Sequence, residues 1–287
     1  LLVAAVMLAL VSLTPDSEPS RLTQQYFHQK LTDLKAELVE LKVSAPKDRL
    51  AQFQKTRLIF KQIEAFIAYQ DDGYHELING ANIISVDESN AQYTTVEPQG
   101  LQVLEALLVD PETTDEQWRA TCSDLERTLQ RLENDARRFS FQGRQVIESV
   151  QQQLVRIEAL HLNGFDSPLL RNSLQESAAS LTSMAEVLDF LKPLITSEAQ
   201  LQCLNTAKDK LVLAAAKLNE SSDFEGFDRL TFLKKFMHPA VSALSDLRIK
   251  LGVETYAEAT GLPAPMADTY SSIYDTNVFN RFFFIRA

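Results

Sequence analysis

The sequence predicts an all-α fold made of two packed antiparallel helical bundles. Apolar residues recur at spacings of three and four along most of the chain, which is the pattern of helices with one buried face. Only 8 Gly and 10 Pro interrupt the 287 residues. The polar stretches between the periodic segments are mostly short, as in antiparallel bundles. No sequence period of roughly 20–50 residues repeats, so a solenoid is not expected.

Composition and charge narrow the functional classes. A hydrophobic content of 45% is enough for a substantial buried core. The formal net charge is −11 at pH 7, and no Lys/Arg stripe is interleaved with aromatic residues. Because such a surface repels phosphate backbones, nucleic-acid binding is not expected.

Residues 1–19 form a separate N-terminal segment. Leu1 to Leu13 is an apolar run broken only by Ser12, and a polar, Pro-containing stretch follows it. We interpret the run as the truncated h-region of a signal peptide, with an uncleaved signal anchor as the alternative. It is too short to span a bilayer unaided. Export is therefore expected, with membrane contact only through this segment if it stays uncleaved.

The first predicted bundle covers residues 20–140, with helices at about 20–43, 47–69, 98–110 and 115–138. Thr114 and Gln117 match a capping box at the start of the last of these helices. Residues 73–99 lack apolar periodicity, so we expect a long loop there with one short helical turn. Loops of this length inside helical folds are often functional.

The second predicted bundle covers residues 141–252, with helices at about 142–162, 168–191, 198–218 and 229–251. Ser167-Pro168 is typical of an N-cap followed by Pro in the first turn, and Ser197 with Gln200 matches another capping box. His238 precedes Pro239 and is expected to mark a turn or kink.

Residues 253–287 are expected to form a linker and tail that leads toward a downstream domain. Five large apolar side chains crowd the end of this segment, and consecutive residues cannot all face one side of a helix or strand. Part of their cover is therefore expected to come from outside the helical bundles. They are Phe279, Phe282, Phe283, Phe284 and Ile285.

The cysteines and histidines suggest no cofactor site. Cys122 and Cys203 are expected to be solitary thiols, with a disulfide between them left open. Neither begins a C-x-x-C-H motif, so covalent haem is excluded within these residues. No His lies three or four residues from another His or Cys, so no single helix offers a metal pair. His161 is expected to complement the dipole at a helix end.

Five polar residues form the candidate site. Gln102 and Glu105 share one face of a predicted helix, and three charged residues share a face of an earlier helix. The cluster is Arg57, Lys61, Glu64, Gln102 and Glu105. A buried ion-pair network that sets helix register explains it without a ligand, and a ligand site is the alternative. No catalytic residue is assigned, and this segment is not expected to be an enzyme.

Two segments resemble a known family. Gly100-Leu-Gln-Val-Leu-Glu105 resembles the G-x-H-x-x-E motif of imelysin-like proteins, and Arg57 to Glu64 resembles the early helix that brings another Glu toward that motif. Here Gln102 stands at the His position. A neutral amide is a poor ligand for zinc or iron, so no tightly bound metal is expected.

The Gln-containing form of the motif, with Asn79-Gly80 and the aromatic tail, resembles the region that precedes the di-haem domain in some bacterial cytochrome c peroxidase-like proteins. The resemblance implies a non-catalytic periplasmic accessory domain. Haem c, peroxide reduction and electron transfer would then belong to a downstream domain, with an electron-donor protein as a further partner. The alternatives are a free-standing imelysin-like periplasmic protein that binds a metal or a peptide, and a helical interaction module without a ligand.

Overall fold

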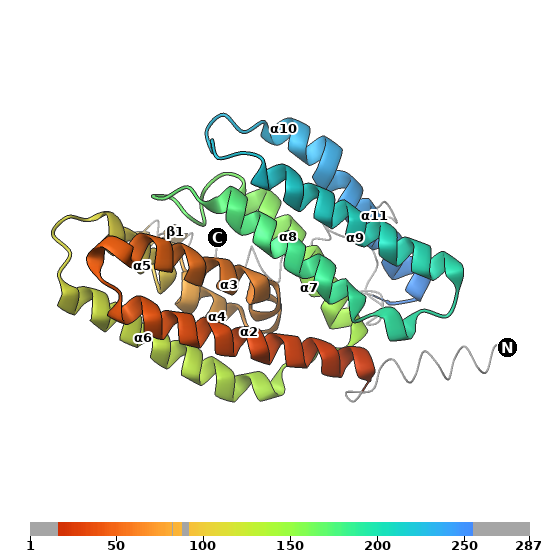
Figure 1. Ribbon diagram of the computed structural model, residues 1–287, viewed down its shortest axis with the longest axis horizontal. Coiled ribbons are helices and arrows are strands. Elements are labelled where there is room, and N and C mark those ends of the chain that lie inside the picture. The colour runs from red at the N-terminus through yellow and green to blue at the C-terminus, as the bar shows by residue number, and fades with distance from the viewer. Residues whose placement is uncertain (1–16, 82, 88–91, 255–287) are drawn as a thin grey trace.

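A computed structural model describes residues 17–81, 83–87 and 92–254 (Figure 1). The protein is predominantly helical with closely packed helices, as the apolar periodicity predicts. The proposed signal segment up to residue 16 and the aromatic tail beyond residue 254 lie outside the described ranges. Among the described helices, none has both the length and the apolar character needed to cross a membrane.

The described residues of the N-terminal half form five helices and a hairpin. The helices are α2 (Glu18–Val43), α3 (Arg49–Gln70), α4 (Asp72–Asn79), α5 (Leu101–Val109) and α6 (Asp115–Asp135), with 3-10 turns at Pro46–Asp48 and Ala136–Arg138. The capping box predicted at Thr114 and Gln117 is confirmed, because each side chain bonds the backbone N–H of the other residue. The segment from Asp115 to Arg138 therefore starts and ends where its sequence predicts.

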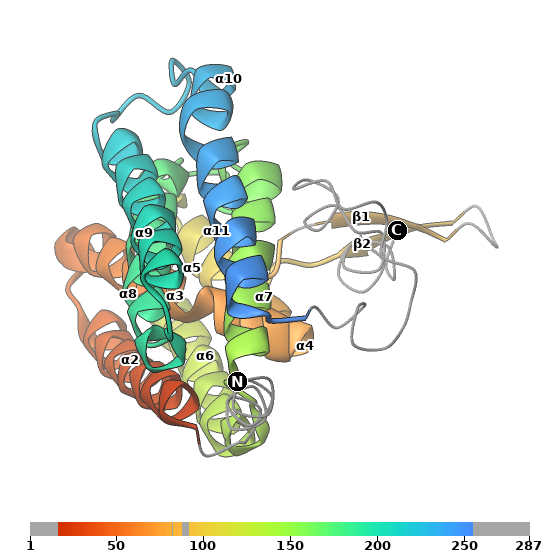
Figure 2. The same ribbon diagram turned by 90° about the vertical axis from the view of Figure 1, so that its right-hand side faces the viewer.

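The prediction of a long loop over residues 73–99 is wrong. Asp71 caps α4 by accepting a hydrogen bond from the backbone N–H of Tyr74, which starts a two-turn helix there. A hairpin follows, formed by antiparallel strands β1 (Ile83–Asp87) and β2 (Gln92–Val96) with Ile83 opposite Val96. The hairpin projects from the helical body (Figure 2). Period-two segments of five residues are too short to stand out beside long helical stripes.

Every element that the structure describes in the C-terminal half, up to residue 254, is helical. It comprises α7 (Gly143–Arg156), α8 (Ser173–Asp189), α9 (Glu198–Asn219), α10 (Arg229–Phe232) and α11 (His238–Leu251), with a 3-10 turn at Lys192–Leu194. Two π-helical turns, Ile157–His161 and Leu233–Met237, extend α7 and join α10 to α11. The second π-turn lies directly before His238-Pro239. A kink is predicted at this position because Pro239 lacks an N–H to donate.

The start of α8 differs from its prediction. Ser167-Pro168 does not begin the helix, which starts at Ser173. The Ser167 hydroxyl instead donates to the Glu105 carboxylate, as do the backbone N–H groups of Leu169 and Leu170. A tertiary contact from another helix has therefore replaced the local cap, and residues 162–172 form an irregular connection between the π-turn and α8.

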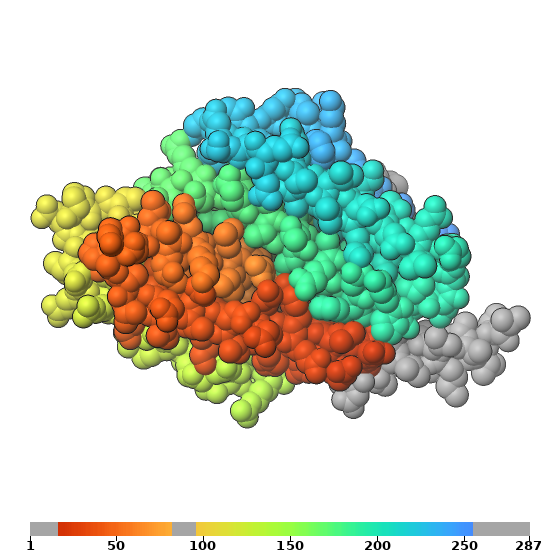
Figure 3. All heavy atoms as spheres, in the orientation of Figure 1, coloured from red at the N-terminus to blue at the C-terminus, as the bar shows by residue number. Residues whose placement is uncertain are grey.

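The two halves of the chain share one buried apolar core. In this core α3 packs against α2, α7 and α8, and α9 covers α8 from the other side (Figure 1). The Phe27 ring of α2 lies 5.4 Å from that of Phe141, between centroids, and Tyr26 hydrogen-bonds Ser183 of α8 over 2.8 Å. Figure 3 shows the N-terminal helices meeting the second half along a continuous seam. Helix α3 is therefore in position to present side chains to both halves.

Both thiols are free in this fold. Cys122 is buried in α6, where burial raises its pKa to about 12, and Cys203 is half-buried on α9. A buried thiol with so high a pKa carries little thiolate and is chemically inert at neutral pH.

Candidate functional site

A buried network of charged and polar side chains lies where α3 meets the second half of the chain. Arg57, Lys61 and Glu64 lie one turn apart on α3, as their spacing predicts, and all three are almost completely shielded from solvent. The remaining members come from α4, α7, the π-turn, the 162–172 connection and α8. The Lys61 network consists of Arg57, Lys61, Glu64, His75, Asn79, Gln153, His161, Asp166 and Glu176.

Lys61 is the centre of this network. Its ammonium donates to Glu64 Oε1 over 2.7 Å and to Asp166 Oδ2 through a short hydrogen bond, and it lies 3.4 Å from His161 Nε2. Two carboxylate oxygens and one imidazole nitrogen therefore surround a buried ammonium that has three N–H bonds to donate. A buried charge without such partners would cost several kcal/mol, so these contacts offset the cost of burying the Lys61 side chain.

Arg57 connects α3 to α8 and to the 162–172 connection. Its Nε and Nη2 donate to the two carboxylate oxygens of Glu176 over 2.6 and 2.8 Å, which is the bidentate geometry of strong guanidinium–carboxylate pairs. Nη2 also donates to the Asp166 carbonyl over 2.7 Å, and Nη1 donates to Asn79 Oδ1 over 3.1 Å. Burial alone would lower the pKa of Arg57, but the Glu176 carboxylate outweighs burial and raises it.

The two carboxylates beside Lys61 are held in their ionised form. Burial works toward raising the pKa of each, and the Lys61 charge overcomes it. The pKa of Glu64 lies well below its ordinary value, and that of Asp166 falls to about 2. Glu64 Oε2 also accepts a 2.6 Å hydrogen bond from Gln153 Nε2, and Asp166 Oδ1 accepts one of 2.8 Å from Asn79 Nδ2.

Two histidines complete the network, and sequence reasoning assigned neither to it. His161 is at a helix end, as predicted, yet its ring is fully buried against Glu64 and Asp166 rather than exposed beside the last carbonyls. His161 is the last residue of the π-turn, and it meets α3 only through tertiary packing, because the two lie about a hundred residues apart in the sequence. His75 on α4 lies 3.2 Å from Glu64 Oε1, and its pKa is lowered by burial first and by the Arg156 charge second.

Glu105 and Gln102 on α5 lie beside the network without a hydrogen bond to its α3 members. Glu105 Oε1 accepts from Ser167 Oγ over 2.8 Å and from the Leu170 N–H over 2.7 Å, so it binds the residue next to Asp166. Within the described chain, Glu105 Oε2 and Gln102 Nε2 are buried without a hydrogen-bond partner. Of the five predicted residues, Arg57, Lys61 and Glu64 thus belong to one hydrogen-bonded network. Glu105 binds Ser167, the neighbour of Asp166 in that network, and Gln102 is not a member.

Three residues of the network have the types and spacing of metal ligands. One donor atom from each of Glu64, His161 and Asp166 lies within 4.8 Å of the other two, and all three side chains are buried. The Lys61 ammonium contacts all three residues, at Glu64 Oε1, Asp166 Oδ2 and His161 Nε2. The two carboxylates that could bind a metal ion are therefore already hydrogen-bonded to the Lys61 side chain.

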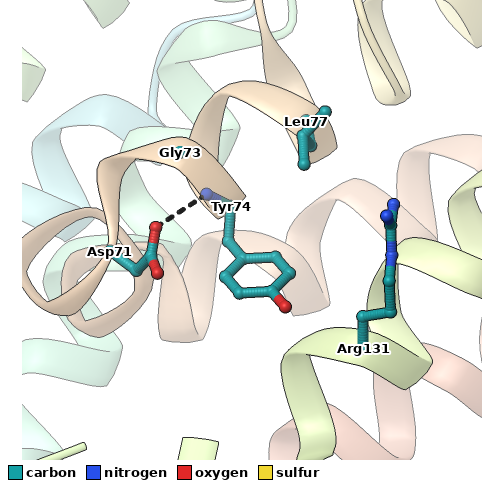
Figure 4. A pocket seen from close by; sticks show the side chains of 5 residues that line it. All are labelled: Asp71, Gly73, Tyr74, Leu77 and Arg131. Atoms are coloured by element: carbon teal, nitrogen blue, oxygen red, sulfur yellow. Dashed lines mark hydrogen bonds between the residues drawn. The ribbon is translucent and has the colours of Figure 1, made fainter. Parts of the chain in front are cut away.

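A shallow surface groove of about 350 Å³ lies between α4 and α6 (Figure 4). Its lining is mostly apolar, and the Tyr74 hydroxyl donates to Asp135 over 2.6 Å. No member of the Lys61 network lines it; the lining residues are Asp71, Gly73, Tyr74, Leu77 and Arg131. Burial and the neighbouring Asp135 raise the pKa of Tyr74 to about 12, so its hydroxyl stays protonated at neutral pH.

Comparison with known proteins adds no assignment to this geometry. No protein-family model matches the chain. A search of curated protein sequences finds no significant relative.

Proposed function

We propose that this chain is a non-catalytic, imelysin-like helical domain of the periplasm that accompanies a di-haem cytochrome c peroxidase-like domain. The observation that carries the non-catalytic part is the position of Lys61. Its ammonium is bonded to the carboxylates that an acid–base or metal mechanism would use. A substrate would have to displace a buried cation and break its hydrogen bonds, which costs several kcal/mol.

The accessory part of the proposal rests on the resemblance of two segments, Arg57–Glu64 and Gly100–Glu105, to the family described above. The Lys61 network, which contains residues of the first segment, lies where α3 packs against α7 and α8. Glu105 of the second segment accepts a hydrogen bond from Ser167, the neighbour of Asp166 in that network. Peroxide reduction and electron transfer from a donor protein would reside in the haem domain, and this domain would hold that neighbour in place.

The coding sequence beyond Ala287 tests the accessory role. Two C-x-x-C-H motifs are expected there, because covalent attachment of two haem groups requires them. A stop codon directly after Ala287 would overturn the haem-domain proposal and leave the helical domain on its own.

A second candidate is a free-standing imelysin-like periplasmic protein that binds a metal or a peptide. The proximity of Glu64, His161 and Asp166 is the observation in its favour. Elemental analysis of the purified chain after mild dialysis separates the two candidates. Less than stoichiometric zinc and iron is expected, because Lys61 already neutralises the donors, whereas one tightly held equivalent would favour the metal-binding candidate.

A further inference from the structure

We propose that Glu64, His161 and Asp166 form a latent site for a divalent transition metal, in which the Lys61 ammonium takes the place of the ion. The site would bind zinc-like ions once the Lys61 side chain is removed. This inference is independent of any haem partner, because it concerns only side chains on α3, the π-turn and the 162–172 connection.

Geometry is the first support. His161 Nε2 lies 3.4 Å from Glu64 Oε2 and 3.6 Å from Asp166 Oδ2. Tetrahedral zinc bonds of about 2.0–2.1 Å place neighbouring ligand atoms roughly 3.3 Å apart. Two of the three distances between donor atoms are therefore already close to the edge length of such a tetrahedron, and the two carboxylate donors lie within 4.8 Å of each other. Three protein ligands leave the fourth position to water, in the space that the Lys61 ammonium vacates.

The surrounding hydrogen bonds are the second support, because metal ligands are normally oriented by groups behind them. The Ser177 hydroxyl donates to the Ser173 carbonyl over 2.6 Å, which leaves it free to accept from His161 Nδ1 at 3.3 Å. The proton on Nδ1 then leaves the Nε2 lone pair facing Lys61. Gln153 and Asn79 support the two carboxylates in the same way.

Charge is the third support. The network and its neighbour Glu105 bury four carboxylates, and among the described residues the lysine and arginine side chains bonded to them are Arg57 and Lys61. Removal of Lys61 increases this excess of negative charge by one unit, and a divalent ion lowers it to less than in the unaltered protein. One imidazole and two carboxylates suit zinc or cobalt better than magnesium, which prefers an octahedron of oxygen ligands.

The test uses Lys61→Ala in the full chain, with Co²⁺ as a spectroscopic probe and Zn²⁺ as its competitor. We expect the variant to bind one equivalent of Co²⁺ with the intense visible absorption of tetrahedral cobalt, and its unfolding midpoint to rise with Co²⁺ or Zn²⁺ but not with Mg²⁺. The unaltered chain should show neither effect. Lys208→Ala is the matched control, because it removes a partly buried lysine bonded to Asp189.

Two further variants assign the ligands. Adding His161→Ala to Lys61→Ala should abolish the cobalt spectrum, and adding Ser177→Ala should weaken affinity about 10-fold or more, as loss of a supporting hydrogen bond does. Equal binding by the His161 double variant would overturn the proposed ligand set. If Lys61→Ala does not fold alone, refolding with and without Zn²⁺ gives the same readout.

Lys61→His provides a second opportunity, since it offers a fourth ligand at the same position. Absence of any zinc-dependent rise in midpoint or refolding yield in both Lys61→Ala and Lys61→His would overturn the proposal.

Discussion

The buried imidazole of His75 makes stability depend on pH in a defined direction. Its pKa is lowered in the fold by burial and by the Arg156 charge, so the unfolded chain takes up a proton at a higher pH than the folded chain. The stabilising contribution is complete above the unfolded value, about 6.5, and is lost as pH falls through the folded pKa. We expect the free energy of unfolding to decrease as pH falls below about 6.5, and His75→Gln to flatten that decrease. Denaturant titrations of both proteins at several pH values measure the free energy of unfolding. The same dependence on pH in both proteins would contradict the prediction.

A second decrease in the free energy of unfolding is expected at more acidic pH. Glu64 and Asp166 have depressed pKa values in the fold, so they stabilise it above pH about 4 and lose that contribution as pH falls toward 2. For Asp166 alone this is on the order of 2 kcal/mol. Asp166→Asn should therefore be less stable at neutral pH and less sensitive to acid between pH 4 and 2.

Members of the Lys61 network could be predicted from the sequence where they lie on the same helix. Arg57, Lys61 and Glu64 are three or four positions apart on one helix, so their common face follows from helical geometry. Lys61 and His161 are separated by 100 positions, and Arg57 and Glu176 by 119. No local pattern encodes such pairs, and for that reason His75, His161, Asp166 and Glu176 were not assigned to the site.

At the scale of elements, the close approach of α4 to the start of α5 depends on Gly100. This residue has φ +56° and ψ −117°, and a Cβ there would lie 2.1 Å from the Ile78 carbonyl oxygen. We expect Gly100→Ala to destabilise the protein by about 3 kcal/mol or more, because both the backbone conformation and the contact are unfavourable.

Gly252 provides the matched control for this prediction. It also has a positive φ, +66°, but a Cβ there would meet nothing within 4 Å. Gly252→Ala should therefore cost only the left-handed penalty of about 1–2 kcal/mol. Equal losses for the two variants in denaturant unfolding would mean that the contact with Ile78 contributes nothing.

The boundaries of most helices were predictable from caps and apolar periodicity, and the exceptions have physical causes. The start of α8 was misplaced because Ser167 bonds Glu105 of α5 instead of capping its own helix. The π-turn at Ile157–His161 was also missed, since its extra residue is specified by packing rather than by a sequence motif. Both deviations position the segment that carries Asp166.

At the scale of the whole molecule, the Arg57–Glu176 pair connects the two halves of the chain. Removing one partner strands the other charge in the core, so Arg57→Met and Glu176→Met should each cost about 3–5 kcal/mol. The double variant should lose less than the sum of the two, because no unpaired charge remains from this pair. A thermodynamic cycle of denaturant unfolding measures the coupling.

The exposed pair Arg127–Asp124 on α6 is the control for that cycle, with side chains 70% and 67% exposed. Its removal should cost less than about 1 kcal/mol, since solvent screens the charges. Strict additivity of the Arg57 and Glu176 substitutions would mean that the two halves are not coupled through this pair.

The wide sequence separation of the Lys61 partners also bears on the order of folding. Joining α3 to residues about a hundred positions away closes a long loop. The chain loses conformational entropy when this loop closes, before the new contacts can compensate the loss. Local helix pairs such as α2 with α3 can form earlier. The network then forms on the native side of the folding barrier, so weakening it accelerates unfolding while the rate of folding changes little. The seam between the halves would accordingly be the part of the protein that sets its kinetic lifetime.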